Sequence, residues 1–173
     1  MRLQKLDTVL VTGGCGFIGS NFIHGLLKRY PEKKIINVDS LTYAGNKENL
    51  NLIENNENYK FEQCDIASAQ NLEKVFKRYD IDAVVHFAAE SHVDRSIENP
   101  NIFINTNIYG TYNLLNLALK KNSETIFLHV STDEVYGSLE IDESPFKESN
   151  QYMPNSPYSA SKASSDHLSL IHI

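Results

Sequence analysis

The sequence predicts an α/β fold built on a doubly wound parallel sheet, and three observations support this prediction. An apolar run stops in a glycine-rich turn at Val9–Ser20, V-L-V-T-G-G-C-G-F-I-G-S. Further apolar runs then alternate with stretches of helical spacing along the whole chain. The second run ends at Asp39, where a carboxylate that binds a ribose is expected. Strand, turn, helix, strand and acid together predict a dinucleotide site at the carboxyl ends of the strands.

Composition limits the class of protein. The chain has 173 residues, 41% of them hydrophobic, which suits one domain of ordinary size with a proper core. Its 16 basic and 22 acidic residues give a net charge of −6, and the basic residues are scattered, so we expect no nucleic-acid partner. No apolar run approaches the roughly 20 residues that span a bilayer, so we expect a cytoplasmic protein without a membrane partner. Cys15 and Cys64 lack metal-ligand spacing, which predicts free thiols and no metal site.

Three glycines, Gly13, Gly16 and Gly19, recur at every third position of the turn. We expect Gly13 to permit the tight turn, and Gly16 to let a pyrophosphate approach the backbone. Gly19 would allow the helix to pack closely on the strand. The unpaired N–H groups at the start of the helix would then face the anion. The spacing G-x-x-G-x-x-G departs from the usual G-x-G-x-x-G, so the assignment depends on its context.

The first half of the chain continues the alternation of helices and strands. The predicted elements are a helix from the turn to about Tyr30, a strand ending at Asp39, a loop over 40–50, a strand at Lys60–Cys64 and a helix capped by Ser68. Pro31 stops the first of these helices. The apolar residues of the second follow helical spacing and indicate ordinary core packing.

The second half repeats the pattern. Its predicted elements are a strand at Asp82–Ala89, a long helix opened by Pro100, a strand at Thr125–Ser131, and a last helix with Ser156 as N-cap that runs to the end of the chain. Small residues at the end of the first of these strands would leave room for a flat ligand. His86 lies inside that strand and is expected to be a hydrogen-bonded core residue. The alternation predicts right-handed crossovers, with helices on both faces of the sheet.

Tyr158 and Lys162 lie four residues apart on the last predicted helix, so they share one face. A tyrosine ordinarily has a pKa near 10. We expect the Lys162 ammonium and a cationic nicotinamide ring to lower the pKa of Tyr158 to about 7. Such a tyrosinate could take a proton from a sugar hydroxyl. The alternative is an exposed Tyr and Lys on an ordinary helix, which the preceding nucleotide turn makes the weaker interpretation.

The combination of T-G-G-x-G-F-I-G with Y-x-x-x-K resembles the extended short-chain dehydrogenases/reductases. Four further segments, Asn37–Asn46, Ala88–Ile97, Ser131–Gly137 and Ser156–Leu168, resemble the dTDP-glucose 4,6-dehydratases of that family. The resemblance covers the chain from about residue 8 to Leu168. It implies NAD as cofactor and dTDP-glucose as substrate. The implied reaction oxidises sugar C4, eliminates water across C5 and C6, and returns the hydride to C6, giving dTDP-4-keto-6-deoxyglucose.

The resemblance also implies the catalytic residues, which are Thr132, Asp133, Glu134, Tyr158 and Lys162. The acidic pair Asp133 and Glu134 separates the dehydratases from related epimerases, which have small uncharged residues there. Glu134 would remove the C5 proton, while Asp133 would protonate the departing C6 hydroxyl. Thr132 would hydrogen-bond the C4 oxygen as charge develops on it. The alternative for the acidic pair is a solvated turn.

The cofactor contacts come partly from the motif and partly from the resemblance. The motif indicates Gly13, Gly16, Gly19 and Asp39, and the resemblance adds Phe17, Ile18, Ser40, Leu41, Thr42, Asp65, Ile66, Phe87, Ala88, Ala89, Glu90, Ser91, Thr106, Tyr158 and Lys162. Asp39 would accept two ribose hydroxyls and repel a 2′-phosphate, which favours NAD over NADP. Asp65 could accept from the adenine amino group. Ser91 and Thr132 are the implied contacts to the sugar.

Residues 1–173 correspond to the NAD-binding Rossmann-like domain of this family. We expect the chain to stop before the sixth strand and the sugar-nucleotide domain, and to lack full activity as a fragment. A homodimer is expected through helices 100–121 and 157–173, because the family dimerises through the corresponding helices. The alternatives are a non-catalytic dinucleotide-binding remnant and a related nucleotide-sugar dehydratase or epimerase.

Overall fold

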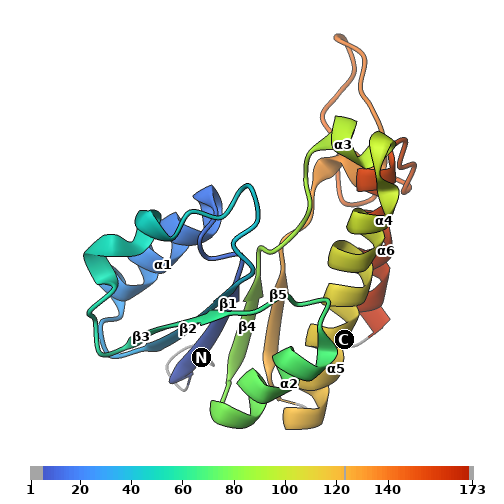
Figure 1. Ribbon diagram of the computed structural model, residues 1–173. Coiled ribbons are helices and arrows are strands. Elements are labelled where there is room, and N and C mark those ends of the chain that lie inside the picture. The colour runs from blue at the N-terminus through green and yellow to red at the C-terminus, as the bar shows by residue number, and fades with distance from the viewer. Residues whose placement is uncertain (1–5, 123, 172–173) are drawn as a thin grey trace.

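The computed structural model of the chain describes residues 6–122 and 124–171 and confirms the predicted fold class. Its sheet consists of five parallel strands, β1 (Thr8–Thr12), β2 (Lys34–Asp39), β3 (Tyr59–Gln63), β4 (Ala83–His86) and β5 (Ile126–His129). Their spatial order is β3-β2-β1-β4-β5, so the chain reverses direction across the sheet between β1 and β4 (Figure 1). Ligands of open α/β sheets bind at such a reversal, outside the carboxyl ends of the strands.

Helices cover both faces of the sheet, as predicted. Helix α1 (Phe17–Arg29) and the 3-10 helix η2 (Lys47–Ile53) lie on one face, and helices α2 (Ala69–Arg78) and α5 (Thr111–Lys121) lie on the other (Figure 1). The alternation of side chains along β1 explains this division. Val9 and Val11 pack in the cluster that contains Ile23 of α1. Leu10 packs in the opposite cluster, with Leu72 and Leu114.

Strand β4 stops at His86, earlier than the predicted end at Ala89. The Phe87 N–H still bonds to the Thr12 carbonyl at 3.1 Å, but the next N–H, that of Ala88, donates to the side-chain Oγ1 of Thr12 at 3.2 Å, so the backbone leaves the ladder there. His86 is a buried, hydrogen-bonded core residue, as predicted, with its ring nitrogens 2.7 Å from Thr12 Oγ1 and 2.9 Å from Thr111 Oγ1.

The predicted long helix from Pro100 is interrupted in the middle. It consists of α4 (Pro100–Phe103), the π-helical segment η3 (Ile104–Gly110) and α5, and a short helix α3 (Val93–Glu98) precedes it without having been predicted. The Thr111 N–H bonds to the carbonyl of Ile108. The Asn107 carbonyl accepts from the hydroxyls of Thr111 and Ser165, each at 2.6 Å. The Ser165 hydroxyl thereby ties this helix to the last one.

Helix α6 (Pro157–Ile171) begins where it was predicted, because the Ser159 N–H donates to Ser156 Oγ at 3.0 Å and completes the N-cap. The prediction that Ser68 caps α2 is wrong, since Ser68 stands at the N-cap position but its side chain makes no capping bond. Asp65 organises this corner instead, by accepting from the Ala67 N–H at 2.8 Å. The expected loop 40–50 runs into η2, whose first turn is capped by Asn46 Oδ1.

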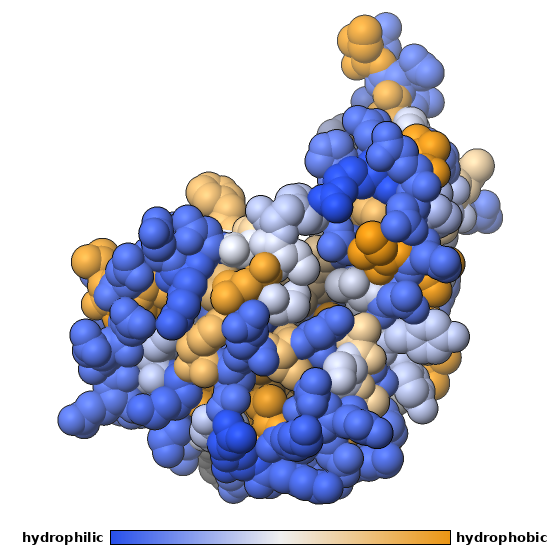
Figure 2. All heavy atoms as spheres, in the orientation of Figure 1, coloured by the Kyte–Doolittle hydropathy of each residue, from blue (hydrophilic) through white to orange (hydrophobic). Residues whose placement is uncertain are grey.

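The segment between β5 and α6 includes the short 3-10 helix η4 (Asp133–Tyr136) and then extends away from the body of the molecule (Figure 1). The space-filling view shows hydrophobic atoms at the tip of this extension (Figure 2), which contains the exposed residues Leu139 and Ile141. Cys15 and Cys64 are buried free thiols. Within the described residues, no helix has the length and apolarity that crossing a membrane requires.

Candidate active site

A cavity of about 570 Å³ opens at the carboxyl ends of the strands. Its wall combines the glycine turn, the end of β2, the segments that follow β3, β4 and β5, and one face of α6. Every predicted cofactor-binding residue except Leu41 lines this cavity. Leu41 packs against the core on the α1 face, and its N–H donates to Asp39 Oδ1 at 2.8 Å. Residues predicted from separate stretches of sequence thus meet at one concave site.

The glycine turn fits closely against the segment after β4. Gly13 has a φ of +70°, and a Cβ at this position would lie 2.6 Å from the Ala88 nitrogen. A Cβ on Gly19 would lie 2.3 Å from the Gly13 carbonyl oxygen. Gly19 therefore allows α1 to pack on the turn itself, rather than on the strand as the sequence suggested. Gly16 is the N-cap of α1 and no side chain caps the helix, so the first N–H groups beside Phe17 and Ile18 remain available to an anion in the cavity.

We predict that Gly13→Ala destabilises the chain by about 2–5 kcal/mol, because it combines a left-handed backbone with an overpacked contact. Gly25→Ala is the matched control, since Gly25 lies in α1 with no atom within 4 Å of the added Cβ. That substitution should stabilise the chain by about 0.5–1 kcal/mol. Urea unfolding curves of the two variants measure both changes. Equal stability of the two variants would contradict this account of the turn.

Asp39 is buried and held on the cavity wall by backbone donors. Its Oδ2 accepts from the Cys15 N–H at 2.9 Å and its Oδ1 from the Leu41 N–H at 2.8 Å. A carboxylate has about four acceptor positions, so both oxygens retain capacity for a ligand hydroxyl. Cys15 beneath it is inert, because burial, with a further contribution from Asp39, raises the pKa of its thiol to about 11.

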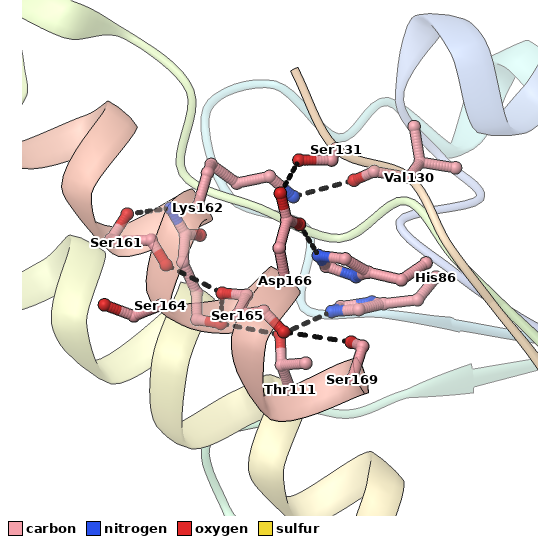
Figure 3. Close-up of polar contacts among 12 residues, drawn as sticks. His86, Thr111, Val130, Ser131, Ser161, Lys162, Ser164, Ser165, Asp166 and Ser169 are labelled. Carbon is pink, nitrogen blue, oxygen red and sulfur yellow. Dashed lines mark hydrogen bonds and ion pairs between the residues drawn. The ribbon is translucent and has the colours of Figure 1, made fainter. Parts of the chain in front are cut away.

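Tyr158 and Lys162 both line the cavity from α6 and both are buried. Lys162 Nζ donates to the carbonyl oxygen of Val130 at 2.7 Å (Figure 3). Burial lowers the pKa of Lys162 to about 8, and the negative charge of Asp166 opposes this shift. The ammonium is thus held at the end of β5.

The protein's own groups do not lower the pKa of Tyr158, so the predicted lowering depends on the nicotinamide ring and stays a prediction. Burial raises this pKa above its ordinary value. A hydrogen bond with Thr132 acts to lower it, while the charges of Glu134 and Asp133 act to raise it. A buried phenol beside carboxylates keeps its proton more firmly, because ionisation would add a negative charge in a region that water solvates poorly.

Thr132, Asp133 and Glu134 follow β5 and do not belong to the cavity wall, in contrast to Tyr158 and Lys162. They lie close enough to Tyr158 to affect its ionisation. Thr132 is the N-cap of η4, and its Oγ1 accepts from the Glu134 N–H at 3.3 Å. The cap fixes the direction in which the acidic pair leaves the strand, with Asp133 exposed and Glu134 partly buried.

Asn107 organises the cavity in a way that the sequence did not indicate. Asn107, on the π-helical segment, bonds with its side chain to the backbone N–H and carbonyl of Glu90, each at 2.9 Å, and to Ser161 Oγ at 2.8 Å. It thereby fixes the cavity wall to α6. Glu90 is 6% exposed, and its Oε2 has no hydrogen-bond partner in the described part of the chain. An unpaired buried carboxylate oxygen at a cavity wall is an acceptor available to a ligand.

Arg95 stacks on an aromatic ring. Its guanidinium carbon lies 4.1 Å from the centroid of the Tyr43 ring, which is the geometry of a cation–π contact. In residues 6–122 and 124–171, no group of three or more His, Cys, Asp or Glu side chains is arranged to hold a metal ion.

Comparison with known proteins identifies relatives along nearly the whole chain. The dTDP-glucose 4,6-dehydratase of Salmonella typhimurium is 48% identical over 176 residues, which cover 92% of this chain and 48% of that protein. The crystal structure of dTDP-glucose 4,6-dehydratase from Bacillus anthracis, in complex with NAD, superposes with a TM-score of 0.84 at 47% identity, covering 95% of this chain and 50% of that one. The UDP-glucose 4-epimerase of Thermus thermophilus, also in complex with NAD, superposes with a TM-score of 0.83 at 30% identity, covering 95% and 50%. The chain therefore spans about half the length of these relatives.

The resemblance noted in the sequence is confirmed by these relatives. A family profile also matches, since the profile described as GDP-mannose 4,6 dehydratase aligns with residues 10–171. That range contains the glycine turn, the acidic pair and the Tyr158–Lys162 pair. The chain belongs to the GDP-mannose 4,6-dehydratase family.

Proposed function

We propose that this chain is the NAD-binding half of a dTDP-glucose 4,6-dehydratase, which converts dTDP-glucose to dTDP-4-keto-6-deoxyglucose and water. The observation that carries the proposal is the position of the acidic pair, since Asp133 and Glu134 affect the ionisation of Tyr158 at a dinucleotide-type cavity. Relatives that are 48–51% identical are named dTDP-glucose 4,6-dehydratase, which supports this choice of substrate.

The cavity fits NAD at each of its ends. The uncapped start of α1 offers N–H groups to the pyrophosphate, and Asp39 offers acceptors to a ribose. Asp65 would accept from the adenine amino group, while the small residues Ala88 and Ala89 leave room for a flat ring. When bound, NAD supplies the acceptor for the C4 hydride and later the donor for C6.

The chain's own residues would move the protons. Tyr158 takes the proton of the C4 hydroxyl, and Thr132 hydrogen-bonds the C4 oxygen. Glu134 removes the C5 proton, which the C4 ketone makes acidic, and Asp133 protonates the departing C6 hydroxyl. Because the protein alone raises the pKa of Tyr158, the tyrosinate depends on a positively charged ring nearby.

A 4-epimerase is the second candidate, since the epimerase of Thermus thermophilus shares the fold and was solved with NAD. Epimerisation at C4 requires neither a base at C5 nor an acid at C6. A 4-epimerase would therefore not use Asp133 and Glu134. Another nucleotide-sugar dehydratase would use the same groups, and a remnant without turnover would retain only the cofactor contacts.

The proposal includes the assignment of residues 1–173 to the NAD-binding domain. The sugar-nucleotide domain would correspond to the half of each relative that this chain does not cover. Turnover therefore has to be tested in a full-length enzyme, by which we mean a dehydratase that carries this chain as its N-terminal half. We also propose a cytoplasmic homodimer. Exposed apolar side chains on the two predicted dimer helices support it, namely Ile104, Tyr109, Tyr112, Leu119 and Leu170.

We predict that the chain binds NAD at least about 100-fold more tightly than NADP, because a 2′-phosphate would meet the Asp39 carboxylate at low dielectric. Asp39→Asn keeps one side-chain oxygen for the backbone donors and removes the charge, so the two affinities should converge. Asp65→Asn is the matched control and should leave the preference unchanged. Titration calorimetry measures all three proteins, and equal affinities in the unaltered chain would remove Asp39 from its proposed role.

A further inference from the structure

The carboxylate of Asp166 joins three segments of the chain. Asp166 lies on α6, one helical turn after Lys162. Its Oδ2 accepts from Ser131 Oγ at 2.6 Å and from the Tyr152 hydroxyl at 3.1 Å. Ser131 follows β5, and Tyr152 belongs to the segment that leads into α6. Figure 3 shows Asp166 pointing away from α6 toward Ser131.

The second oxygen of this carboxylate faces a buried histidine on β5. His129 Nε2 lies 3.1 Å from Asp166 Oδ1, and the two side chains are only 8% and 9% exposed. The distance suits a hydrogen bond but the direction does not, so the contact is electrostatic. On its other side the His129 ring lies against that of His86, with centroids 5.3 Å apart.

Asp166 stays ionised in spite of its burial. Burial acts to raise the pKa of this carboxyl, but the contacts with His129, Ser131 and Tyr152 together hold it below the ordinary value. A buried carboxylate with three contacts is strongly oriented, since each contact removes a direction in which it could turn. It is therefore a fixed negative charge within α6.

Lys162 is a cation whose charge interacts with that of Asp166. Its ammonium donates to the carbonyl of Val130, the residue before Ser131. Lys162 and Asp166 therefore hydrogen-bond to adjacent residues at the end of β5 (Figure 3). Asp166 favours the charged form of Lys162. His86 on β4 is also near, because the charge of Lys162 contributes to lowering the pKa of the His86 ring. Tyr158 shares the face of α6 that carries Lys162.

We propose that Asp166 is a positioning residue of the catalytic centre: it fastens the end of β5 to α6 and presents a fixed negative charge on the face of α6 that carries Lys162. The strand end that it fastens leads directly into Thr132 and the acidic pair. The distance between that pair and Tyr158 would then depend on Asp166, although Asp166 does not line the cavity. The role of Asp166 in catalysis rests on the proposed function. Its contacts with Ser131, Tyr152 and His129 are independent of that function.

The titration of Lys162 tests the proposal in the chain as it is. The ¹³Cε resonance of Lys162 should titrate with a midpoint near the pKa of about 8 in the unaltered chain. In Asp166→Asn the midpoint should fall by about one unit, because the opposite charge is removed while the shape is kept. Tyr152→Phe removes one contact of the carboxylate without changing its charge, and should shift the midpoint much less. An unchanged midpoint in Asp166→Asn, or an equal shift in Tyr152→Phe, would overturn the proposal.

The reciprocal variant gives a second reading if Asp166→Asn does not fold. Interaction between two charges is mutual, so Lys162→Met should raise the pKa of Asp166, followed through its ¹³Cγ resonance. No change in that titration would equally overturn the proposal. Neither titration uses NAD. A chain that fails to bind NAD would refute the proposed function, but the titrations of Lys162 and Asp166 could still be interpreted.

Discussion

Tyr158→Phe should lower the turnover of dTDP-glucose by about 10³-fold in the full-length enzyme, the usual contribution of a positioned general base. The variant retains the ring and its packing against Phe103, whose centroid lies 6.4 Å away, so the fold and the cavity should persist. Only the proton acceptor for the C4 hydroxyl is lost. Steady-state rates measure the effect, and titration calorimetry should show that NAD still binds.

Tyr30→Phe is the control for this prediction, because Tyr30 lies just beyond α1 and outside the cavity wall. Its turnover should equal that of the unaltered enzyme. A Tyr158→Phe variant that keeps more than a tenth of the original rate would show that another group removes the proton.

Glu134→Gln should suppress exchange of the C5 proton by about 10²–10⁴-fold in the full-length enzyme, since an amide cannot act as the base. Oxidation at C4 precedes this step and should survive. Proton NMR in heavy water follows the incorporation of deuterium at C5, and absorbance of the reduced cofactor follows the oxidation. The same pair of measurements separates loss of the base from loss of substrate binding.

Asp133→Asn is the matched comparison, because it alters the neighbouring carboxyl at the same strand end. We expect it to spare exchange at C5 and to suppress loss of water from C6. Normal exchange in Glu134→Gln would contradict the role proposed for Glu134, and exchange lost equally in both variants would contradict the division of labour between the two carboxyls.

The sequence could predict the parallel sheet and most of the cavity wall because both follow from local patterns. Parallel strands bring their carboxyl ends to one edge, so residues that follow separate apolar runs, such as Asp39, Asp65 and Ala88, must meet there. The glycine spacing likewise predicted a position that requires glycine. Gly13 has a φ of +70°, and the absence of a Cβ leaves room for Ala88.

Other features depend on partners that lie far apart in the sequence. The bond from Ser131 to Asp166 spans 35 residues, and the one from Asn107 to Ser161 spans 54, so no local pattern signals them. The π-helical segment at 104–110 likewise has a distant partner, because the Asn107 carbonyl accepts from the Ser165 hydroxyl of α6. Asn107 is a polar residue among apolar helix positions, and this was the hint in the sequence that its side chain has a buried partner.

The direction in which the protein's own groups shift the pKa of Tyr158 could not be predicted from the sequence for a related reason. The spacing of Tyr158 and Lys162 places them on one helix face but does not say where the ammonium points. In the structure it donates to Val130, while two carboxylates lie near the phenol. A motif identifies the residues of a site, whereas its electrostatics require the positions of all neighbouring charges.

The product formed from dTDP-glucose tests the central claim most directly. The full-length enzyme, incubated with NAD and dTDP-glucose, should release a dTDP-4-keto-6-deoxy sugar whose C6 methyl group and C5 deuterium are visible by NMR in heavy water. Formation of dTDP-galactose instead, without exchange at C5, would contradict the account and identify the cavity as that of a 4-epimerase.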